Sequence, residues 1–516
     1  MMAKREMKLN VLEYLEDGAI RSPSKAAIID GEKVFTFAQV DDSAKRCAAH
    51  LIRRLDVINQ PIAVFLPKCA ETIFANLGVV GSGNIYTNLD VKSPAQRIRN
   101  IFDKIAPALV ITSQALVGTL VGVGVPEERI VRIEDALAER TTDEGSLAAR
   151  QARIVDTDPL CIISTSGSTG TPKGVTLSHR GTIDFMEWLF ATFDFDENVR
   201  IGSLSPLYFD IYILELFLCL SKGATLVLVP DQAAAFPARL LEFLQAQKVN
   251  FLFWVPSIMV TIANLGLLDQ YDLSSLRNVF FAGEVFPTKQ LNQWRRTLPA
   301  ARFVNLYGPI EIHVDCTYFV VDREFGDDEP LPIGHPCRNT DILILDDEDH
   351  PCAAGVRGEL CVRGSSLALG YWNDPEKTAK AFVQNPLNTR YPELIYRTGD
   401  VVYRDGRDEI FLVGRKDFQI KHMGYRIDLQ EIEHQVHCVQ GIAQACVLYN
   451  RPTKEITVFY VALSEAVTPL DIRKYLATIF PKYMIPTAFQ AMKSLPMNPN
   501  GKIDRNGLSG LLSAPQ

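Results

Sequence analysis

Short apolar runs alternate with longer helical segments from about residue 60 to about residue 310. The apolar runs are rich in β-branched and aromatic residues, and they predict buried strands at 62–66, 109–112, 160–164, 225–229, 251–255 and 279–282. Segments between them, such as 236–247, have a helical pattern. Because such alternation is typical of parallel sheets covered by helices, this region predicts an α/β architecture.

The pattern changes after about residue 340. From there to about residue 415, apolar runs are separated by turn residues, which predicts a more antiparallel sheet. A smaller unit follows, in which Asp428 and Glu431 have the spacing of a capping box that opens a helix. Residues 455–463 predict a strand, and Pro469 directly after Thr468 predicts the start of a further helix.

Composition and charge narrow the range of functions. A chain of 516 residues is long enough for two or more domains, and its net charge of −8 argues against a nucleic-acid partner. No apolar run is long enough to span a bilayer, and the first residues do not resemble a secretory signal. We therefore expect a cytoplasmic protein with no membrane partner. The ten cysteines include no C-x-x-C pair, which favours buried free thiols over disulfides or zinc.

The strongest local motif is the glycine-rich stretch at 164–174, Ser-Thr-Ser-Gly-Ser-Thr-Gly-Thr-Pro-Lys-Gly, directly after a predicted strand. Its glycines allow close approach of the backbone to a ligand, and its hydroxyls and lysine favour an anion, so it predicts a phosphate-binding loop. The spacing differs from that of a Walker A loop. A flexible polar linker is the alternative, and the position directly after a buried strand argues against it.

This stretch closely resembles the phosphate loop of the adenylate-forming superfamily, which contains acyl-CoA synthetases, luciferases and the adenylation domains of nonribosomal peptide synthetases. Further stretches resemble that family's motifs in the same order, at 282–284, 307–311, 358–382, 396–400, 414–433 and 495–505. The resemblance spans roughly residues 20–508 and implies that the chain uses ATP and Mg²⁺.

The resemblance also implies the roles of individual residues. Thr165, Glu311 and Lys502 are expected to be catalytic, and Glu311 is the expected magnesium ligand, a hard oxygen donor that suits this ion. The residues expected to bind ATP are Thr165, Ser166, Gly167, Ser168, Thr169, Gly170, Lys173, Gly283, Glu284, Asn305, Tyr307, Gly308, Asp400, Phe411, Arg415 and Lys502. Among them, Tyr307 is expected to face adenine, and Asp400 and Arg415 to bind the ribose.

Lys502 lies in an Asn-Gly-Lys turn, where a solvent-exposed lysine is the ordinary interpretation. In the family, this lysine contacts oxygens of the substrate carboxylate and of the phosphate. Asp417 is the expected hinge about which the smaller domain rotates between two half-reactions, and the face around 421–426 is expected to line the approach of a thiol. We thus expect two domains: residues 1–415, with parallel-rich sheets, helices and a β-barrel-like subdomain, and residues 416–516, a small mobile α+β domain.

Asp210 indicates the class of acid that is activated. It precedes a strongly apolar stretch, and its carboxylate either caps the helix that begins at Ile211 or pairs with a ligand. In amino-acid adenylation domains, an aspartate directly after phenylalanine at this point binds the α-ammonium group of the substrate. The other expected pocket residues are Ile211, Leu214, Trp254, Phe280, Ala282, Leu306, Val314 and Asp315, together with Lys502.

Trp254 and Phe280 predict a tight apolar pocket for a small side chain. The set is most similar to that of free-standing proline-activating enzymes, so L-proline is our first expectation, with D- or L-alanine or a substituted proline next. Asp315 departs from that pattern, and it is either structural or a partner of the substrate. The chain ends 14 residues after Lys502, so the expected acyl acceptor is the phosphopantetheine thiol of a discrete carrier protein, with coenzyme A second. A basic patch is expected to help carrier binding, with candidates Lys416, Lys421, His422 and Arg426.

Two other interpretations remain open on sequence alone. The first is a coenzyme A ligase for a small carboxylic acid, which shares the fold and the first step and is disfavoured by Asp210. The second is an inactive relative that acts as a binding module, which is disfavoured by the presence of Lys502, Glu311 and Asp400.

Overall fold

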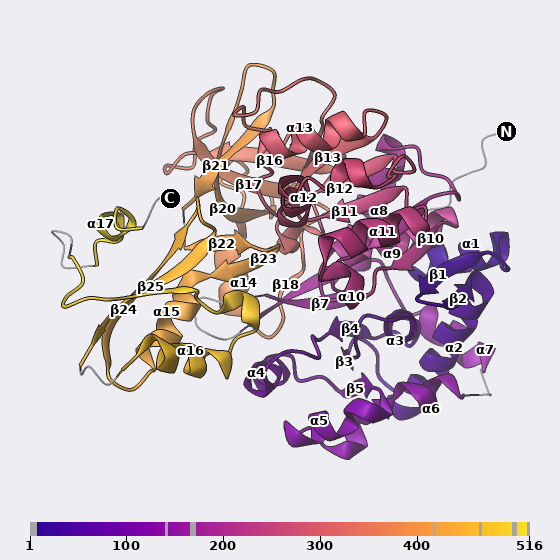
Figure 1. The fold of residues 1–516 in the computed structure, drawn as a ribbon. Coiled ribbons are helices and arrows are strands. Elements are labelled where there is room, and N and C mark those ends of the chain that lie inside the picture. Colours follow the sequence, from indigo (N-terminus) through magenta and orange to yellow (C-terminus); the bar gives the residue numbers. More distant parts are fainter. Residues whose placement is uncertain are drawn as a thin grey trace. The chain divides into compact units, whose positions relative to one another are not determined.

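The structure is a computed structural model that describes residues 8–139, 143–165, 172–416, 418–463, 467–497 and 503–512. The chain forms two compact units (Figure 1). The large unit contains Met1–Val91, Pro107–Ile163 and Gly174–Lys416, and the small unit contains Lys92–Ala106, Ser164–Lys173 and Asp417–Gln516. Among the described residues, no helix has both the length and the apolar character needed to cross a membrane.

A nine-stranded sheet forms one half of the large unit. Its strands, in spatial order, are β15 (His335–Pro336), β14 (Thr317–Val320), β13 (Arg302–Tyr307), β12 (Asn278–Phe281), β11 (Phe251–Trp254), β9 (Arg200–Ser203), β10 (Thr225–Leu228), β1 (Ala26–Asp30) and β2 (Lys33–Thr36). The strands from β13 to β1 pair in parallel, and the outer pairs are antiparallel. The predicted parallel α/β region is therefore present.

A second sheet has seven strands in the order β18 (Gly370–Tyr371), β8 (Lys173–Ser178), β7 (Pro159–Thr165), β4 (Ile85–Asn88), β3 (Pro61–Phe65), β5 (Leu109–Thr112) and β6 (Ile130–Arg132). Strands β3, β4 and β5 are buried along their whole length, as expected for parallel strands covered on both faces. This explains why they appear in the sequence as continuous apolar runs.

The helices of the large unit bury both faces of the nine-stranded sheet. Helix α9 (Ile211–Lys222) is buried from Ile211 to Leu220 and belongs to the larger of the two hydrophobic cores that contain side chains of this sheet's central strands. The second core contains side chains from α11 (Pro237–Ala246), α12 (Pro256–Asn264) and α13 (Thr288–Thr297), packed on side chains from β11, β12 and β13. Neighbouring residues of one strand therefore belong to different cores.

Further helices of the large unit are α1 (Leu12–Arg21), α2 (Phe37–Arg54), α3 (Ala70–Gly81), α5 (Val117–Gly122), α6 (Ile133–Leu137), α7 (Glu144–Gln151), α8 (His179–Thr192), α10 (Asp231–Ala234) and α14 (Pro375–Ala381). A third sheet is antiparallel and contains β16 (Thr340–Leu345), β17 (Gly358–Gly364), β20 (Leu394–Arg404), β19 (Phe382–Gln384) and β21 (Ile410–Arg415). It occupies the stretch for which the sequence predicts antiparallel strands.

The small unit contains α4 (Ala95–Ile105) and most of the C-terminal residues. Its strands are β22 (Gln419–His422) and β23 (Tyr425–Asp428), which form a hairpin, and β24 (Ile442–Asn450), β25 (Glu455–Ala462) and β26 (Ala488–Ala491), which form a three-stranded sheet. The helices after the hairpin are α15 (Leu429–His437), α16 (Pro469–Ala477) and α17 (Arg505–Ser509).

Two of the predicted helix starts have their caps in the structure. Thr468 forms a complete capping box with Asp471 at the start of α16. Asp428 is the N-cap of α15, but its carboxylate accepts from the backbone N–H of Gln430, and Glu431 is buried. The helix therefore begins at the predicted residue. Its cap hydrogen bond comes from the N–H of Gln430, whereas a capping box would use the N–H of the next residue, Glu431.

Candidate functional site

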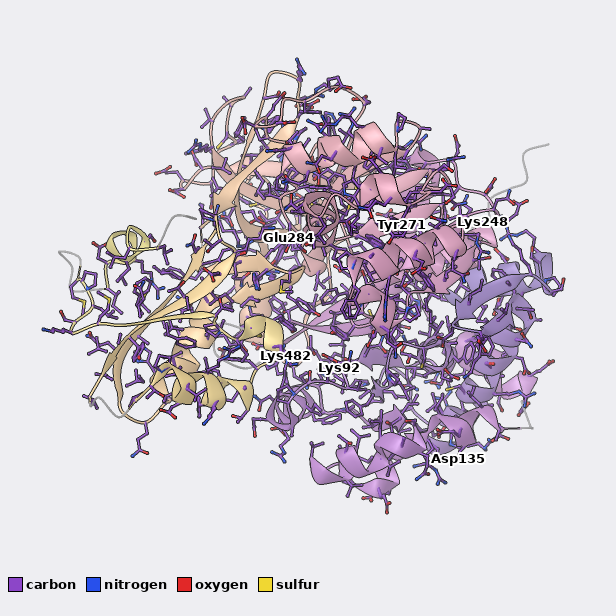
Figure 2. The ribbon with its side chains drawn as sticks, viewed as in Figure 1. Lys92, Asp135, Lys248, Tyr271, Glu284 and Lys482 are labelled. Carbon is purple, nitrogen blue, oxygen red and sulfur yellow. The ribbon has the colours of Figure 1, made fainter. Side chains whose placement is uncertain are left out.

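The carboxyl ends of the parallel strands of the nine-stranded sheet bring several predicted residues to one edge. Gly283 and Glu284 follow β12, and Tyr307 is the last residue of β13. Gly283 has φ of +91°, a conformation that favours glycine. The Glu284 carboxylate, labelled in Figure 2, accepts from the backbone N–H of Ser257 at 3.0 Å in the first turn of α12. In open α/β sheets this edge is where ligands bind.

Three predicted ATP-site residues contact one another beside this edge. The Tyr307 hydroxyl donates to Oδ2 of Asp400 at 2.5 Å, and the Arg415 guanidinium donates to Oδ1 of Asp400 at 2.7 Å. Arg415 also donates to the backbone carbonyl of Thr398 at 2.9 Å. Burial, followed by the Asp400 charge, raises the pKa of the Tyr307 hydroxyl well above its ordinary value, so it remains a donor. The result is an oriented carboxylate beside a cation and an aromatic ring.

The predicted magnesium ligand lies in the loop after β13. Glu311 is fully buried, and its Oε1 accepts from the Tyr371 hydroxyl at 2.8 Å. Within the described ranges, no group of three or more His, Cys, Asp or Glu side chains is arranged to bind a metal. A single carboxylate oxygen fits Mg²⁺ bound mainly by nucleotide phosphates and water, because this ion takes few protein ligands. Tyr371 is a contact that the sequence did not single out, although it lies inside the 358–382 motif.

A tight turn follows Glu311. A Cβ atom at Gly308 would lie 2.4 Å from the Cα of Asp315, so only glycine fits there. His313 and Val314 both have positive φ, +53° and +61°, which is rare for such residues and typical of strained functional loops. The His313 ring Nδ1 lies 2.7 Å from the carbonyl oxygen of Ser366, and its Nε2 accepts from the N–H of Ser178 at 3.0 Å. His313 thus fixes the loop that contains Glu311.

Acidification is expected to destabilise the protein between pH 6.5 and about pH 4 through two buried histidines. Burial lowers the pKa of His313 and of His179 from 6.5 to about 4. The unfolded chain binds these protons below pH 6.5 and the folded chain does not, so each stabilising contribution is complete above pH 6.5 and lost as the pH falls to about 4. Each is worth about 3 kcal/mol.

Denaturant unfolding at pH 7.5 and pH 4.5 checks this, with wild type compared with His313→Gln and with the exposed control His350→Gln. We expect His313→Gln to lower stability at pH 7.5 and to lose less on acidification than wild type. An equal loss in wild type and His313→Gln would contradict the assignment.

The predicted pocket residues that the structure describes lie on one face of the sheet, except Trp254. Phe280 pairs with Val304 across β12 and β13, so Phe280, Ala282 and Leu306 point to the same side, where all three are buried in the larger core. The same core contains Ile211, Leu214 and Val314, and Asp315 is also buried. Asp210 is the N-cap of α9, and its carboxylate accepts from the N–H of Ile211 at 3.0 Å.

Trp254 lies apart from this set. Its side chain is in the second core, on the α11–α13 side of the sheet, where its indole N–H donates to the carbonyl of Gly202 at 3.2 Å. Successive residues of a strand point to opposite faces, and Trp254 pairs with Phe281, whereas Phe253 pairs with Phe280. Phe253 therefore occupies the face on which the other pocket residues lie. Counting in steps of two across the paired strands could have found it.

The remaining predicted residues are distributed as follows. Thr165 is the buried last residue of β7, and Lys173 begins β8. The Asn305 side chain donates to the carbonyl of Pro332 at 2.8 Å, and Phe411 stacks on Tyr403 with ring centroids 5.2 Å apart. Six residues of the predicted phosphate loop lie outside the described residues, as do Asp417 and Lys502; the six are Ser166, Gly167, Ser168, Thr169, Gly170 and Thr171.

The expected basic patch is divided between the two units. Lys416 is in the large unit, where its ammonium pairs with Asp347 at 2.7 Å and lies 3.6 Å from Glu359. Lys421, His422 and Arg426 are in the β22–β23 hairpin of the small unit, where Arg426 donates to Gln419 at 2.6 Å. The Asp347 partner makes Lys416 a member of a local ion-pair network.

Comparison with known proteins identifies the family. A family model described as AMP-binding enzyme matches residues 15–372, and one described as AMP-binding enzyme C-terminal domain matches residues 431–502. Tyrocidine synthase 3 from Brevibacillus parabrevis is 31% identical over 499 residues, which cover 96% of this chain and 8% of that protein. A dimodular nonribosomal peptide synthase from Bacillus subtilis (strain 168) is 30% identical over 510 residues, covering 98% of this chain and 21% of that protein. The chain thus spans less than a quarter of the length of either relative.

The solved structure of holo-PA1221, an NRPS protein containing adenylation and PCP domains, is similar in fold. It has a TM-score of 0.84 and 24% sequence identity, and the match covers 98% of this chain and 85% of that chain. At this identity the likeness shows the fold alone, and it confirms the expected adenylation-enzyme fold. The two family matches confirm the resemblance to adenylate-forming enzymes and the expected class, an ATP-dependent adenylating ligase. The chain belongs to the AMP-binding enzyme family.

Proposed function

We propose that this protein uses ATP to convert a small amino acid into its aminoacyl-adenylate, with release of pyrophosphate. The observation on which the amino-acid substrate rests is Asp210. Its carboxylate lies at the N-terminus of α9, next to a run of buried apolar residues that begins with Ile211. A substrate α-ammonium would pair with this carboxylate, which a fatty or aryl acid does not require.

The ATP site is proposed at the Tyr307–Asp400–Arg415 cluster. The Asp400 carboxylate would accept hydrogen bonds from the ribose hydroxyls, and Arg415 holds it in place. Glu311 would hold Mg²⁺, which when bound offsets phosphate charge. Lys502 and the 164–174 loop would contact the triphosphate and the substrate carboxylate, so that the carboxylate oxygen attacks the α-phosphorus and pyrophosphate leaves. The carboxylate is already ionised at neutral pH, so this step needs no general base.

The pocket favours a compact side chain. Phe280 lies 4.9 Å from Phe193 and 6.4 Å from Phe253 between ring centroids, and these rings fill space on the pocket face of the sheet. We propose Phe253 in place of Trp254 as the aromatic pocket residue on β11. L-proline is the first candidate substrate, followed by D- or L-alanine and substituted prolines. Asp315 is buried on the same loop as Val314, and a substituted proline with a polar ring group would suit it.

The second half-reaction is proposed to transfer the aminoacyl group to the phosphopantetheine thiol of a discrete carrier protein. The relatives described as tyrocidine synthase 3 and dimodular nonribosomal peptide synthase support this assignment. The domains proposed at 1–415 and 416–516 would rotate relative to each other about Asp417. Lys502 would serve the first half-reaction, and after the rotation the face at 421–426 would line the approach of the thiol. The second candidate is a coenzyme A ligase for a small carboxylic acid, which the same fold allows.

The test is amino-acid-dependent ATP–pyrophosphate exchange, screened over the common amino acids and simple aryl and fatty acids. Strong exchange with proline supports both the reaction and the substrate. Exchange with another amino acid supports the reaction and overturns proline. Exchange with non-amino acids only overturns the role of Asp210, and silence with every acid favours an inactive relative.

Replacement of Asp210 is expected to lower kcat/KM for the amino acid roughly 10- to 100-fold, because a charge-assisted hydrogen bond worth roughly 1.5–3 kcal/mol is lost. Asn and Ser are both good N-cap residues, so Asp210→Asn and Asp210→Ser keep the start of α9 and remove the charge, and Asp210→Asn also keeps the size of the side chain. Exchange kinetics and melting temperature are measured together. Full activity in both variants would reduce Asp210 to a helix cap.

A further inference from the structure

A buried carboxylate lies next to the proposed ribose site without being part of it. Glu359, on β17, is 6% exposed. Its Oε1 accepts from the backbone N–H of Gly399 at 3.1 Å, and its Oε2 accepts from the Arg397 guanidinium at 3.0 Å. The Lys416 ammonium lies 3.6 Å from the same Oε2. A buried carboxylate is costly unless paired, and these three groups provide its partners.

The segment that Glu359 contacts is irregular. The register between β17 and β20 shifts between Glu359 and Cys361, and that between β20 and β21 shifts between Val401 and Val402. Such shifts mark a β-bulge, a feature that re-aims side chains near functional sites. Gly399 has φ of +73°, which a residue with a side chain rarely adopts. Asp400, the next residue, therefore owes its direction to this bulge.

Neighbouring strands hold the bulge from both sides. On the β17 side, Glu359 binds the N–H of Gly399, and the Thr398 hydroxyl donates to the carbonyl of Leu360 at 2.7 Å. On the β21 side, the N–H of Lys416 donates to the carbonyl of Gly399 at 2.8 Å. The N–H of Gly399 is thus bound by the Glu359 carboxylate, and the carbonyl of Gly399 is bound by the backbone N–H of Lys416. The ammonium group of the same Lys416 lies next to the Glu359 carboxylate.

The carboxylates at the rim of this network are more exposed. Asp347 pairs with Lys416, and its side chain is 84% exposed; Asp349 pairs with Arg397. Neither rim residue contacts Gly399 in the hydrogen bonds that the structure gives. Removing the Asp347 charge therefore changes the charge around Lys416 and leaves the bulge intact, which makes it a matched control.

We propose that Glu359 is a positioning residue for ribose recognition. It fixes the Gly399 peptide so that Asp400 presents its carboxylate to the ribose hydroxyls. The Glu359 carboxylate also lies next to the ammonium group of Lys416, the residue before the proposed hinge. ATP binding and the start of the hinge thereby depend on one buried carboxylate. This inference rests on the ribose site of the proposed function.

The test compares binding of ATP, 2′-deoxy-ATP and 3′-deoxy-ATP by calorimetry to wild type, Glu359→Gln, Asp400→Asn and Asp347→Asn. In wild type, loss of a hydroxyl that is bound to a carboxylate is expected to weaken binding roughly 10- to 100-fold. In Glu359→Gln, as in Asp400→Asn, the preference for ATP over the deoxynucleotides is expected to fall below about 3-fold, whereas Asp347→Asn keeps the wild-type preference.

A purely structural role for Glu359 would weaken binding of all three nucleotides equally, and an unchanged preference in Glu359→Gln would overturn the proposal. If Glu359→Gln does not fold, Glu359→Asp, which withdraws the carboxylate from Gly399 by one methylene, is used in the same comparison. Binding requires no acid substrate. A wild-type protein that prefers ATP over the deoxynucleotides but activates no amino acid would therefore contradict the proposed substrate class. Even then, a loss of this preference in Glu359→Gln and Asp400→Asn alone would support the positioning role of Glu359.

Discussion

Lys502→Ala is expected to lower amino-acid-dependent ATP–pyrophosphate exchange by about 10²- to 10³-fold. In the proposed reaction, two anions meet when the substrate carboxylate attacks the α-phosphorus. A cation placed against both offsets the charge that repels them, and it does so most strongly when water is excluded. Alanine removes the cation and leaves the backbone unchanged, so the effect is expected in the rate of adenylation.

The residues around Lys502 indicate that this variant will fold. Met497 and Ile503 form an antiparallel bridge, and the N–H of Asp504 donates to the carbonyl of Pro496 at 2.8 Å. The Arg505 guanidinium donates to both oxygens of Glu433 at 2.6 and 2.7 Å, and Leu508 is fully buried. These contacts fix both ends of the segment without the lysine side chain.

Two half-reactions are measured to test the role of Lys502. Exchange reports adenylate formation, and transfer to a carrier thiol from added aminoacyl-adenylate reports the second step. We expect Lys502→Ala to lose the first and retain the second, and the exposed control Lys493→Ala to retain both. Equal loss of both activities would contradict a role specific to adenylation, and wild-type exchange in Lys502→Ala would remove the lysine from the mechanism.

Lys68→Met is expected to destabilise the large unit by about 3–5 kcal/mol, because it leaves a buried carboxylate without its cation. The Lys68 ammonium donates to the carbonyl of Ser203 at 2.5 Å, and the Ser203 hydroxyl donates to Glu215 at 2.6 Å. Burial raises the pKa of the Glu215 carboxyl and lowers the pKa of the Lys68 ammonium, and each charge opposes the shift of the other. Without Lys68, the pKa of Glu215 rises further and the carboxyl is held neutral at a cost in stability.

Denaturant unfolding at pH 7.5 compares wild type with Lys68→Met, with the double variant Lys68→Met/Glu215→Leu, and with Lys33→Met. Lys33 pairs with Glu71 at 3.1 Å on the surface, so its loss is expected to cost about 1 kcal/mol or less. The double variant is expected to recover most of the loss, since an apolar pair of similar volume often replaces a buried ion pair. Equal effects of Lys68→Met and Lys33→Met would contradict a buried pair.

Local patterns were sufficient to predict the elements. Parallel strands buried on both faces require continuous apolar runs, so 62–66 and 109–112 could be identified as the strands β3 and β5. The start of α16 was likewise predicted because Thr468, Pro469 and Asp471 act within one helical turn. The glycine-rich stretch at 164–174 was recognised from its composition alone, and six of its residues, 166–171, lie outside the described ranges.

The arrangement of side chains within the site depended on tertiary structure. Trp254 and Phe253 are adjacent and similar in character, and only the pairing of β11 with β12 determines which of them lies on the same face of the sheet as Phe280. Asp210 is a second example of what the sequence leaves open. Its position in the sequence allows the carboxylate to be either a helix cap or the partner of a substrate ammonium, and the structure shows the cap hydrogen bond.

The sequence by itself determined the family, the order of the motifs and the class of most elements, because these depend on neighbouring residues and on periodicity. It did not determine the contacts that give those motifs their chemistry. Tyr307 and Asp400 are 93 residues apart, and Glu359 and Gly399 are 40 apart, yet each pair is joined by a hydrogen bond. Such contacts arise from the register of paired strands and from the pairing of buried charges, which are properties of the folded chain.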